Sequence, residues 1–229
     1  MISVIIPVYN ERGTILEIIR RVRAETTPKE IIVVDDGSTD GTRALLAGVG
    51  GGDVQVILQE RNRGKGAAIR AGLAAARGDL VIIQDADLEL DPADYAALLD
   101  PLLTGKAQVV YGARFLLPQN REGYRLISRL GNAAVTGWTN LLFGSRLTDE
   151  ATGYKVMPAA LLRSLDLECD RFDFCAEVTA KLLRRGILIH EVPVRFNPRT
   201  YVEGKKIGWR DGLLTLWVLL RYRLRRERS

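Results

Sequence analysis

Two aspartates one residue apart, Asp85 and Asp87, follow directly after the apolar run Leu80–Ile83 and Gln84. A buried strand that ends in two carboxylates places two hard oxygen ligands at the edge of a sheet, where α/β proteins usually bind their ligands. Two anions held this close repel each other unless a cation joins them. Mg²⁺ or Mn²⁺ bridging to a diphosphate suits such a pair. Taken alone, the sequence Asp85-Ala86-Asp87 is equally typical of a solvated turn.

The elements that must position these carboxylates alternate between strand and helix patterns. Strands are expected at residues 3–8, 30–34, 54–58, 80–84 and 109–111, and helices at 14–24, 40–47 and 66–76, with a further helix start at Asp91-Pro92. This order predicts an α/β fold with a mostly parallel central sheet flanked by helices on both faces. The later part is less regular, with helices expected at 124–143, 174–185 and 209–226 and a strand at 187–192.

Polar clusters follow the first four expected strands, at residues 7–11, 35–38, 61–66 and 85–89. Because the ends of parallel strands share one edge, these clusters should converge. Carboxylates that meet the loop Gly64-Lys65-Gly66 indicate a nucleotide-diphosphate site, in which Lys65 and backbone N–H groups bind phosphate. The loop matches neither a Walker motif nor a dinucleotide fingerprint, and alone it is as well explained by the start of a helix.

Length and composition indicate one domain over residues 1–229. Cys169 and Cys175 match no zinc or redox motif, which predicts reduced thiols in a cytoplasmic protein. We expect no signal peptide, because the N-terminus enters a strand directly. The late apolar run Leu213–Leu220 is far shorter than the roughly 20 residues that a membrane span needs.

Positive charge is concentrated at the C-terminal end. Residues 199–229 hold nine Lys/Arg and three Asp/Glu, a net charge of +6, whereas the rest of the chain carries −1. This predicts an anionic partner, a lipid surface or a phosphate, and no nucleic-acid motif is present. We expect an amphipathic basic helix over 207–229 that lies on an anionic membrane, with a membrane-anchoring protein as a further candidate partner. The alternative is a helix docked on the core with solvated arginines.

Five segments together resemble a known family. Residues 3–11, 34–40 and 85–87 are similar, in this order, to family-two glycosyltransferases of the GT-A fold. Residues 148–155 and 199–212 resemble the dolichyl- and polyprenyl-phosphate mannose and glucose synthases. The resemblance covers nearly the whole chain, and the last segment is the more specific one for the lipid-phosphate branch.

The resemblance implies roles on the donor side. Residues that match those holding the nucleotide base and ribose are Pro7, Tyr9, Glu11 and Asp36. Asp85 and Asp87 match ligands of the metal, Mg²⁺ or Mn²⁺, and of the diphosphate. Glu89 would be a third metal ligand, although relatives often carry Gln or another polar residue there.

Arg114 and Arg129 match arginines implicated in binding the donor or the acceptor phosphate, and Arg199 and Lys205 match an acceptor-side loop that closes over the phosphates. The candidate catalytic residues are Asp87, Arg129 and Asp149, the last as a general base or as an orienting group. A lipid phosphate is largely dianionic at neutral pH and needs no strong base.

The resemblance therefore implies an inverting transferase that moves mannose from GDP-mannose, or glucose from UDP-glucose, to polyprenyl or dolichyl phosphate at the cytoplasmic face of a membrane. Two alternatives remain open at this point. One is a glycosyltransferase that acts on a saccharide hydroxyl, and the other is a non-catalytic nucleotide-sugar-binding scaffold.

Overall fold

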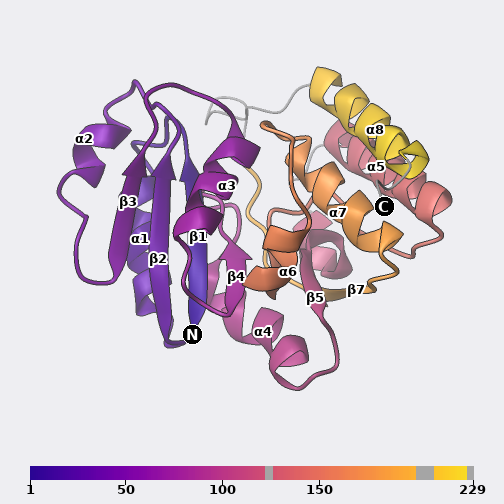
Figure 1. Ribbon diagram of the computed structural model, residues 1–229, viewed down its shortest axis with the longest axis horizontal. Helices are drawn as coiled ribbons and strands as arrows, with labels where there is room; N and C mark the ends of the chain where they lie inside the picture. Colours follow the sequence, from indigo (N-terminus) through magenta and orange to yellow (C-terminus); the bar gives the residue numbers. More distant parts are fainter. Residues whose placement is uncertain (122–125, 200–208, 226–229) are drawn as a thin grey trace.

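The computed structural model describes residues 1–121, 126–199 and 209–225. Within them, seven strands form one sheet in the order β3-β2-β1-β4-β6-β5-β7 (Figure 1). The strands are β1 (Ile2–Val8), β2 (Lys29–Asp35), β3 (Val54–Leu58), β4 (Leu80–Ile83), β5 (Val109–Ala113), β6 (Lys155–Pro158) and β7 (Ile189–Pro193). All pairings are parallel except those of β6, which is antiparallel to both β4 and β5. The expected mostly parallel sheet is confirmed.

Helices cover both faces of this sheet. They are α1 (Ile15–Ala24), α2 (Thr42–Leu46), α3 (Lys65–Ala75), α4 (Tyr95–Leu103), α5 (Leu126–Phe143), α6 (Ala159–Ser164), α7 (Phe174–Arg184) and α8 (Trp209–Leu224). The alternation of β1 assigns its side chains to opposite layers. Val4 and Ile6 pack in the core beneath α1 and α4, whereas Ile5 packs in the core with residues of α3 and α7.

Strand β6 was not expected from the sequence. It has four residues and follows the polar stretch 148–153, so no alternation marks it. Val156 nevertheless pairs with Ile82 on one side and with Val110 on the other. The strand therefore joins the half of the sheet formed by β1 to β4 to the half formed by β5 and β7.

Helix α8 docks on α5 and α7, and Figure 1 shows it beside α5. Val218, Leu219 and Tyr222 of α8 are buried there. The last residues of the helix expected over 207–229 lie outside the described part of the chain. None of the described helices is long and apolar enough to cross a membrane.

A buried carboxylate, Glu177, holds α8 in place. Its oxygens accept hydrogen bonds from the Tyr222 hydroxyl (2.6 Å) and from the backbone N–H groups of Glu168 and Cys169 (both 2.8 Å), and Lys181 forms an ion pair with it (2.8 Å). Burial is the largest influence and raises the pKa of Glu177, but these donors outweigh it, so the pKa is lowered. The Glu177 carboxylate thus connects α7, α8 and the segment before α7.

We predict that Glu177→Gln lowers the free energy of unfolding at pH 7 by about 3 kcal/mol, because it removes one partner of a buried ion pair. A lowered folded-state pKa stabilises the fold above the unfolded-state pKa, and this contribution is lost as the pH falls through the folded-state value. The difference in free energy of unfolding between wild type and Glu177→Gln should therefore become smaller from pH 7 to pH 4, as measured by urea titrations. Tyr222→Phe, which removes a single donor, should cost about 2 kcal/mol. A pH-independent gap for Glu177→Gln would contradict this assignment.

Candidate active site

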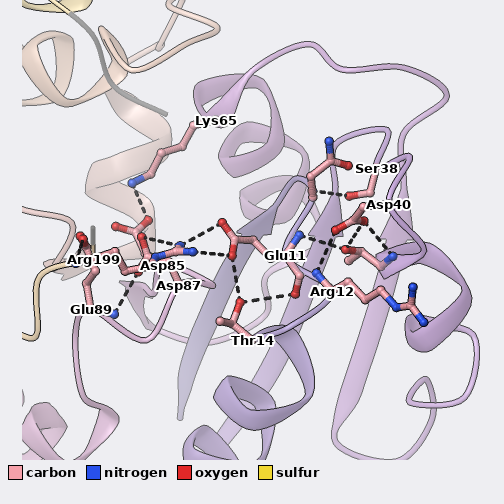
Figure 2. A network of polar contacts seen from close by, with 12 residues as sticks. Glu11, Arg12, Thr14, Ser38, Asp40, Lys65, Asp85, Asp87, Glu89 and Arg199 are labelled. Atoms are coloured by element: carbon pink, nitrogen blue, oxygen red, sulfur yellow. Dashed lines mark hydrogen bonds and ion pairs between the residues drawn. The ribbon is translucent and has the colours of Figure 1, made fainter. Parts of the chain in front are cut away.

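The loops that follow β1, β2, β3 and β4 meet at one edge of the sheet, as their parallel order requires. The loop after β1 is fastened to the loop after β2 by Asn10, whose N–H donates to the Ser38 hydroxyl (2.9 Å) and whose amide oxygen accepts from the Thr39 N–H (2.8 Å). The N–H of Arg12 donates to Asp40 in the same way (3.0 Å). Figure 2 shows this region beside the carboxylates that follow β4.

Asp85, at the end of β4, forms an ion pair with Lys65 at the start of α3. The Lys65 Nζ lies 2.5 Å from Asp85 Oδ1, and the two side chains are 15% and 23% exposed. Burial alone would lower the pKa of the Lys65 ammonium, but the attraction of Asp85 outweighs it and the pKa is raised. Lys65 is therefore a charged partner of Asp85 and is held at the sheet edge.

Asp87 and Glu11 share the guanidinium of Arg199 (Figure 2). Arg199 Nη2 lies 3.2 Å from Asp87 Oδ2 and 3.0 Å from Glu11 Oε1, and Nη1 donates to Glu11 Oε2 (3.0 Å). The backbone N–H of Arg199 donates to Glu89 (2.9 Å). Arg199 lies 188 positions after Glu11 in the chain and thus contacts three acidic residues of the first half of the chain, Glu11, Asp87 and Glu89.

The donor set fits a divalent cation only in combination with a substrate. Asp85 and Asp87 are one residue apart and each remains about one-quarter exposed. Among the described residues, no three His, Cys, Asp or Glu side chains are grouped to hold a metal on their own, and Glu89 faces the Arg199 backbone. Mg²⁺ is commonly held by one or two carboxylates together with substrate phosphates, so the pair suffices for such a site.

Asp36, the candidate base-binding residue, is 2% exposed at the end of β2. Its two oxygens accept hydrogen bonds from the backbone N–H groups of Arg63 and Gly64, both at 2.8 Å. Burial raises the pKa of Asp36 against the opposing effect of these two donors. Asp36 thereby fixes the loop that carries Lys65, while Pro7 and Tyr9 are half-buried at the end of β1.

The glycines of the Gly64-Lys65-Gly66 loop have a packing reason. A Cβ on either would collide with the backbone of Cys169 or Asp170, and Gly64 also has a φ of +106°. The N–H of Ala67 donates to the Asp170 carbonyl oxygen (3.0 Å), so this N–H of α3 is already satisfied within the protein. Binding of phosphate by Lys65 and by the other backbone N–H groups of this loop stays a prediction.

Arg114 and Asp149 form a buried pair on the second-half side of the site. Asp149 is fully buried and accepts from the Arg114 Nε and Nη2 (both 2.7 Å) and from its backbone N–H (2.9 Å). The guanidinium also lies 5.2 Å from the centroid of the Phe196 ring. This geometry makes Asp149 an orienting group for Arg114, and phosphate binding by Arg114 stays a prediction.

Arg129 and Lys205 are the two remaining candidates for binding phosphate. Arg129 lies on α5, is half-buried and makes no hydrogen bond or ion pair with the described residues. Lys205 lies outside the described residues, as does most of the 199–212 segment. Their proposed roles in binding phosphate stay predictions.

Glu150, next to Asp149, was not singled out from the sequence. It is fully buried, and neither carboxylate oxygen has a hydrogen-bond partner among the described residues. The nearby Thr179 hydroxyl donates instead to the Cys175 carbonyl oxygen (3.0 Å). Burial is the dominant influence and raises the pKa of Glu150 despite the attraction of Lys155. A polar residue within a polar stretch gives no sequence signal of such burial.

The fold is that of the GT-A glycosyltransferases. The profile of Glycosyl transferase family 2 matches residues 3–164, and the chain belongs to that family. It is 33% identical to the polyprenol monophosphomannose synthase of Mycolicibacterium smegmatis, over 90% of this chain and 80% of that protein. It is 27% identical to the low-salt glycan biosynthesis hexosyltransferase Agl6 of Haloferax volcanii, over 91% of this chain but only 51% of that protein.

A solved structure agrees with this assignment. Glucosyl-3-phosphoglycerate synthase from Mycobacterium tuberculosis, in complex with Mn²⁺, UDP and phosphoglyceric acid, superposes with a TM-score of 0.71. The alignment covers 99% of this chain and 80% of that one, at 25% sequence identity. The family and fold implied by the sequence motifs are therefore confirmed.

We predict that Glu150 makes the fold less stable as the pH rises. A raised folded-state pKa stabilises the protein fully below the unfolded-state pKa, and this contribution is lost as the pH rises through the folded-state value. Glu150→Gln cannot ionise. Between pH 4 and pH 8 the free energy of unfolding of wild type should therefore fall by about 1 to 3 kcal/mol relative to that of the variant, because a buried carboxylate without a hydrogen-bond partner is costly to ionise. Urea titrations measure this, with exposed Glu60→Gln as control. An equal gain in the control would contradict the assignment.

Proposed function

We propose that this protein is an inverting glycosyltransferase that moves a hexose from a nucleotide-diphosphate sugar to a polyprenyl or dolichyl phosphate. The observation that carries the proposal is the pair Asp85 and Asp87 at the end of β4, each matched by a cationic side chain from another element. The similarity to a polyprenol monophosphomannose synthase over most of both chains supports the lipid-phosphate branch. Residues 1–229 would act as one catalytic domain.

On the donor side, Asp85 and Asp87 would hold Mg²⁺ or Mn²⁺, which when bound supplies positive charge to the departing diphosphate without a proton. Glu89 would be an outer contributor, since its carboxylate faces the Arg199 N–H. Lys65 and Arg199 lie beside the same carboxylates and offer hydrogen bonds that strengthen as negative charge grows on the leaving group. Residues proposed to hold the base and ribose are Pro7, Tyr9, Glu11 and Asp36.

On the acceptor side, a phosphate monoester with a second pKa near 6 is already nucleophilic at neutral pH. Its oxygen attacks the anomeric carbon as the bond to the diphosphate breaks. What this attack needs is cationic side chains that offset the repulsion between the two phosphate groups. We assign this role to Arg114, oriented by Asp149, together with Arg129, Arg199 and Lys205.

The state of the carboxylates favours this acceptor over a saccharide hydroxyl, which needs a base to take its proton. Glu11, Asp85, Asp87 and Asp149 are all engaged with cationic side chains. Such an arrangement suits the binding of phosphate charge more than proton removal. GDP-mannose and UDP-glucose are the proposed donors; the similar mycobacterial structure holds UDP and Mn²⁺.

Asp87→Asn should lower the rate of hexose transfer by about 100-fold or more, because it removes a carboxylate that would hold the divalent cation and thereby weakens the stabilisation of the leaving diphosphate. The assay uses purified protein, Mn²⁺ or Mg²⁺, each donor in turn and a short polyprenyl phosphate, with the product read by mass spectrometry. Asp53→Asn, at an exposed carboxylate where β3 begins, is the matched control and should retain the wild-type rate. Equal rates for the two variants would rule out the assigned role of Asp87.

An acceptor panel tests the substrate class. We expect product with polyprenyl phosphate and not with neutral sugars. Product formed with sugars alone would favour the hydroxyl-acceptor alternative, and donor binding without any product would favour the scaffold alternative.

The exposed side of α8 and α5 supports attachment to a membrane. Trp217 is 55% exposed and lines an apolar hollow of about 350 Å³. The other residues that line the hollow are Leu216 and Leu220 of α8 and Ala134 and Trp138 of α5. Further exposed apolar side chains on the two helices are Leu126, Ile127, Leu130, Leu141, Leu213, Leu214 and Leu224. Arg221, Arg223 and Arg225 are exposed at the end of the same helix. We propose peripheral binding to the anionic cytoplasmic face of a membrane, with or without an anchoring protein.

Trp217→Glu should weaken binding to vesicles that contain phosphatidylglycerol by about tenfold, because an exposed indole would no longer enter the interface. Co-sedimentation with anionic and with neutral vesicles measures this. Leu103→Glu, at a 72% exposed leucine that ends α4, adds the same charge elsewhere and should bind as wild type does. Equal loss in both variants would argue against the α5–α8 surface.

A further inference from the structure

Gln84 is an amide buried between an apolar strand and the two site aspartates, and it is 0% exposed. Its Nε2 donates to the carbonyl oxygens of Asp85 (3.0 Å) and Leu90 (3.4 Å), so the side chain connects the beginning of the loop 85–90 to its end. Carbonyl oxygens only accept, which fixes the amide nitrogen toward the loop. The amide oxygen must therefore face the other way.

Two tyrosine hydroxyls donate to that amide oxygen. Tyr95, the first residue of α4, lies at 2.9 Å and Tyr154, just before β6, lies at 2.7 Å. Both tyrosines are fully buried, and their rings meet edge to face with centroids 6.0 Å apart. Every polar atom of the Gln84 side chain is thus engaged, a condition under which a buried polar network makes one arrangement strongly preferred.

The loop 85–90, which Gln84 holds, contains a residue in an uncommon backbone conformation. Leu88, between Asp87 and Glu89, has a φ of +63°, a backbone region that a leucine rarely occupies. Outside the amide network, the Glu89 carbonyl oxygen accepts from the Asn197 N–H (2.9 Å). Strain of this kind persists where the surrounding structure imposes it, which the contacts on both sides of the loop do here.

Tyr154 also connects the loop to the second half of the site. The adjacent Gly153 packs so closely on the Asp85 carboxylate that a Cβ would collide with it. Gly112, two residues before Arg114, makes two hydrogen bonds with this segment. Its N–H donates to the Tyr154 carbonyl oxygen (3.0 Å), and its carbonyl oxygen accepts from the Thr152 hydroxyl (2.5 Å). One short segment thus contacts both the site aspartates and the strand that presents Arg114.

We propose that Gln84, Tyr95 and Tyr154 are positioning residues, which hold the loop 85–90 in the shape that binds a divalent cation and set it against the Arg114–Asp149 pair. This inference rests on the proposed function, because it takes Asp85 and Asp87 as the metal-binding carboxylates. It assigns to three buried side chains, none of which contacts the substrate, an effect on metal affinity that acts through the loop 85–90. Partners in contact with metal ligands commonly change that affinity by 10–100-fold.

The test compares three substitutions that each delete one buried tyrosine hydroxyl from the full chain. Tyr154→Phe and Tyr95→Phe remove the two donors to Gln84, whereas Tyr111→Phe removes a hydroxyl that contacts Thr179 (3.0 Å). Mn²⁺ affinity is measured by electron paramagnetic resonance with UDP and, separately, with GDP, at a temperature where circular dichroism shows all proteins folded. We expect about tenfold weaker Mn²⁺ binding in Tyr154→Phe and Tyr95→Phe and a change below about twofold in Tyr111→Phe.

A second readout separates positioning from general damage. The Mn²⁺ concentration that gives half-maximal transfer should rise in the two Gln84-linked variants, and saturating Mn²⁺ should restore most of the rate. If Tyr154→Phe does not fold, Tyr95→Phe tests the same amide oxygen from the other side. If the wild type binds Mn²⁺ and the three variants have equal Mn²⁺ affinities, this inference alone is overturned. Absence of Mn²⁺ binding in the wild type with both nucleotides overturns the proposed function and this inference with it.

Discussion

Repulsion between carboxylates at one edge of the sheet is the constraint on which the site depends. Glu11, Asp85 and Asp87 reach this edge from two neighbouring strands, and their charges can coexist there only if cations lie among them. Lys65 and Arg199 supply those cations, from α3 and from the segment after β7. Asp85 and Asp87 are also the proposed ligands of a divalent ion, so binding of substrate and metal would rearrange the ion pairs that Lys65 and Arg199 form with them.

Charge is handled differently on the other side of the site. Arg114 and Asp149 are buried together with three short hydrogen bonds, which satisfies both groups at the cost of their hydration. Glu150 beside them lacks such a partner in the described part of the chain, and burial raises its pKa. The two adjacent acids therefore differ in environment: one orients an arginine, and the other is disfavoured in its charged form.

Much of this arrangement could be predicted from the sequence, because strand and helix periodicity fixes the order β1 to β4 and parallel order fixes which loops meet. The convergence of residues 7–11 with 85–89 follows from that alone. The pairing of Arg114 with Asp149, 35 residues apart, does not, since it depends on where β6 enters the sheet. Gln84 was hidden for another reason: an amide that ends an apolar strand gives no sign of the two hydroxyls that reach it from α4 and from the segment before β6.

The antiparallel strand β6 has a consequence for the newly made chain. β4 and β5 are separated in the sheet by β6, so β5 has no neighbouring strand until residues 155–158 have been synthesised. Until then β4 presents an unpaired edge, the kind of edge that invites pairing with other chains. The nascent protein thus carries its two aspartates beside an unpaired strand edge until β6 (Lys155–Pro158) has been made, and this strand of four residues then covers the edge.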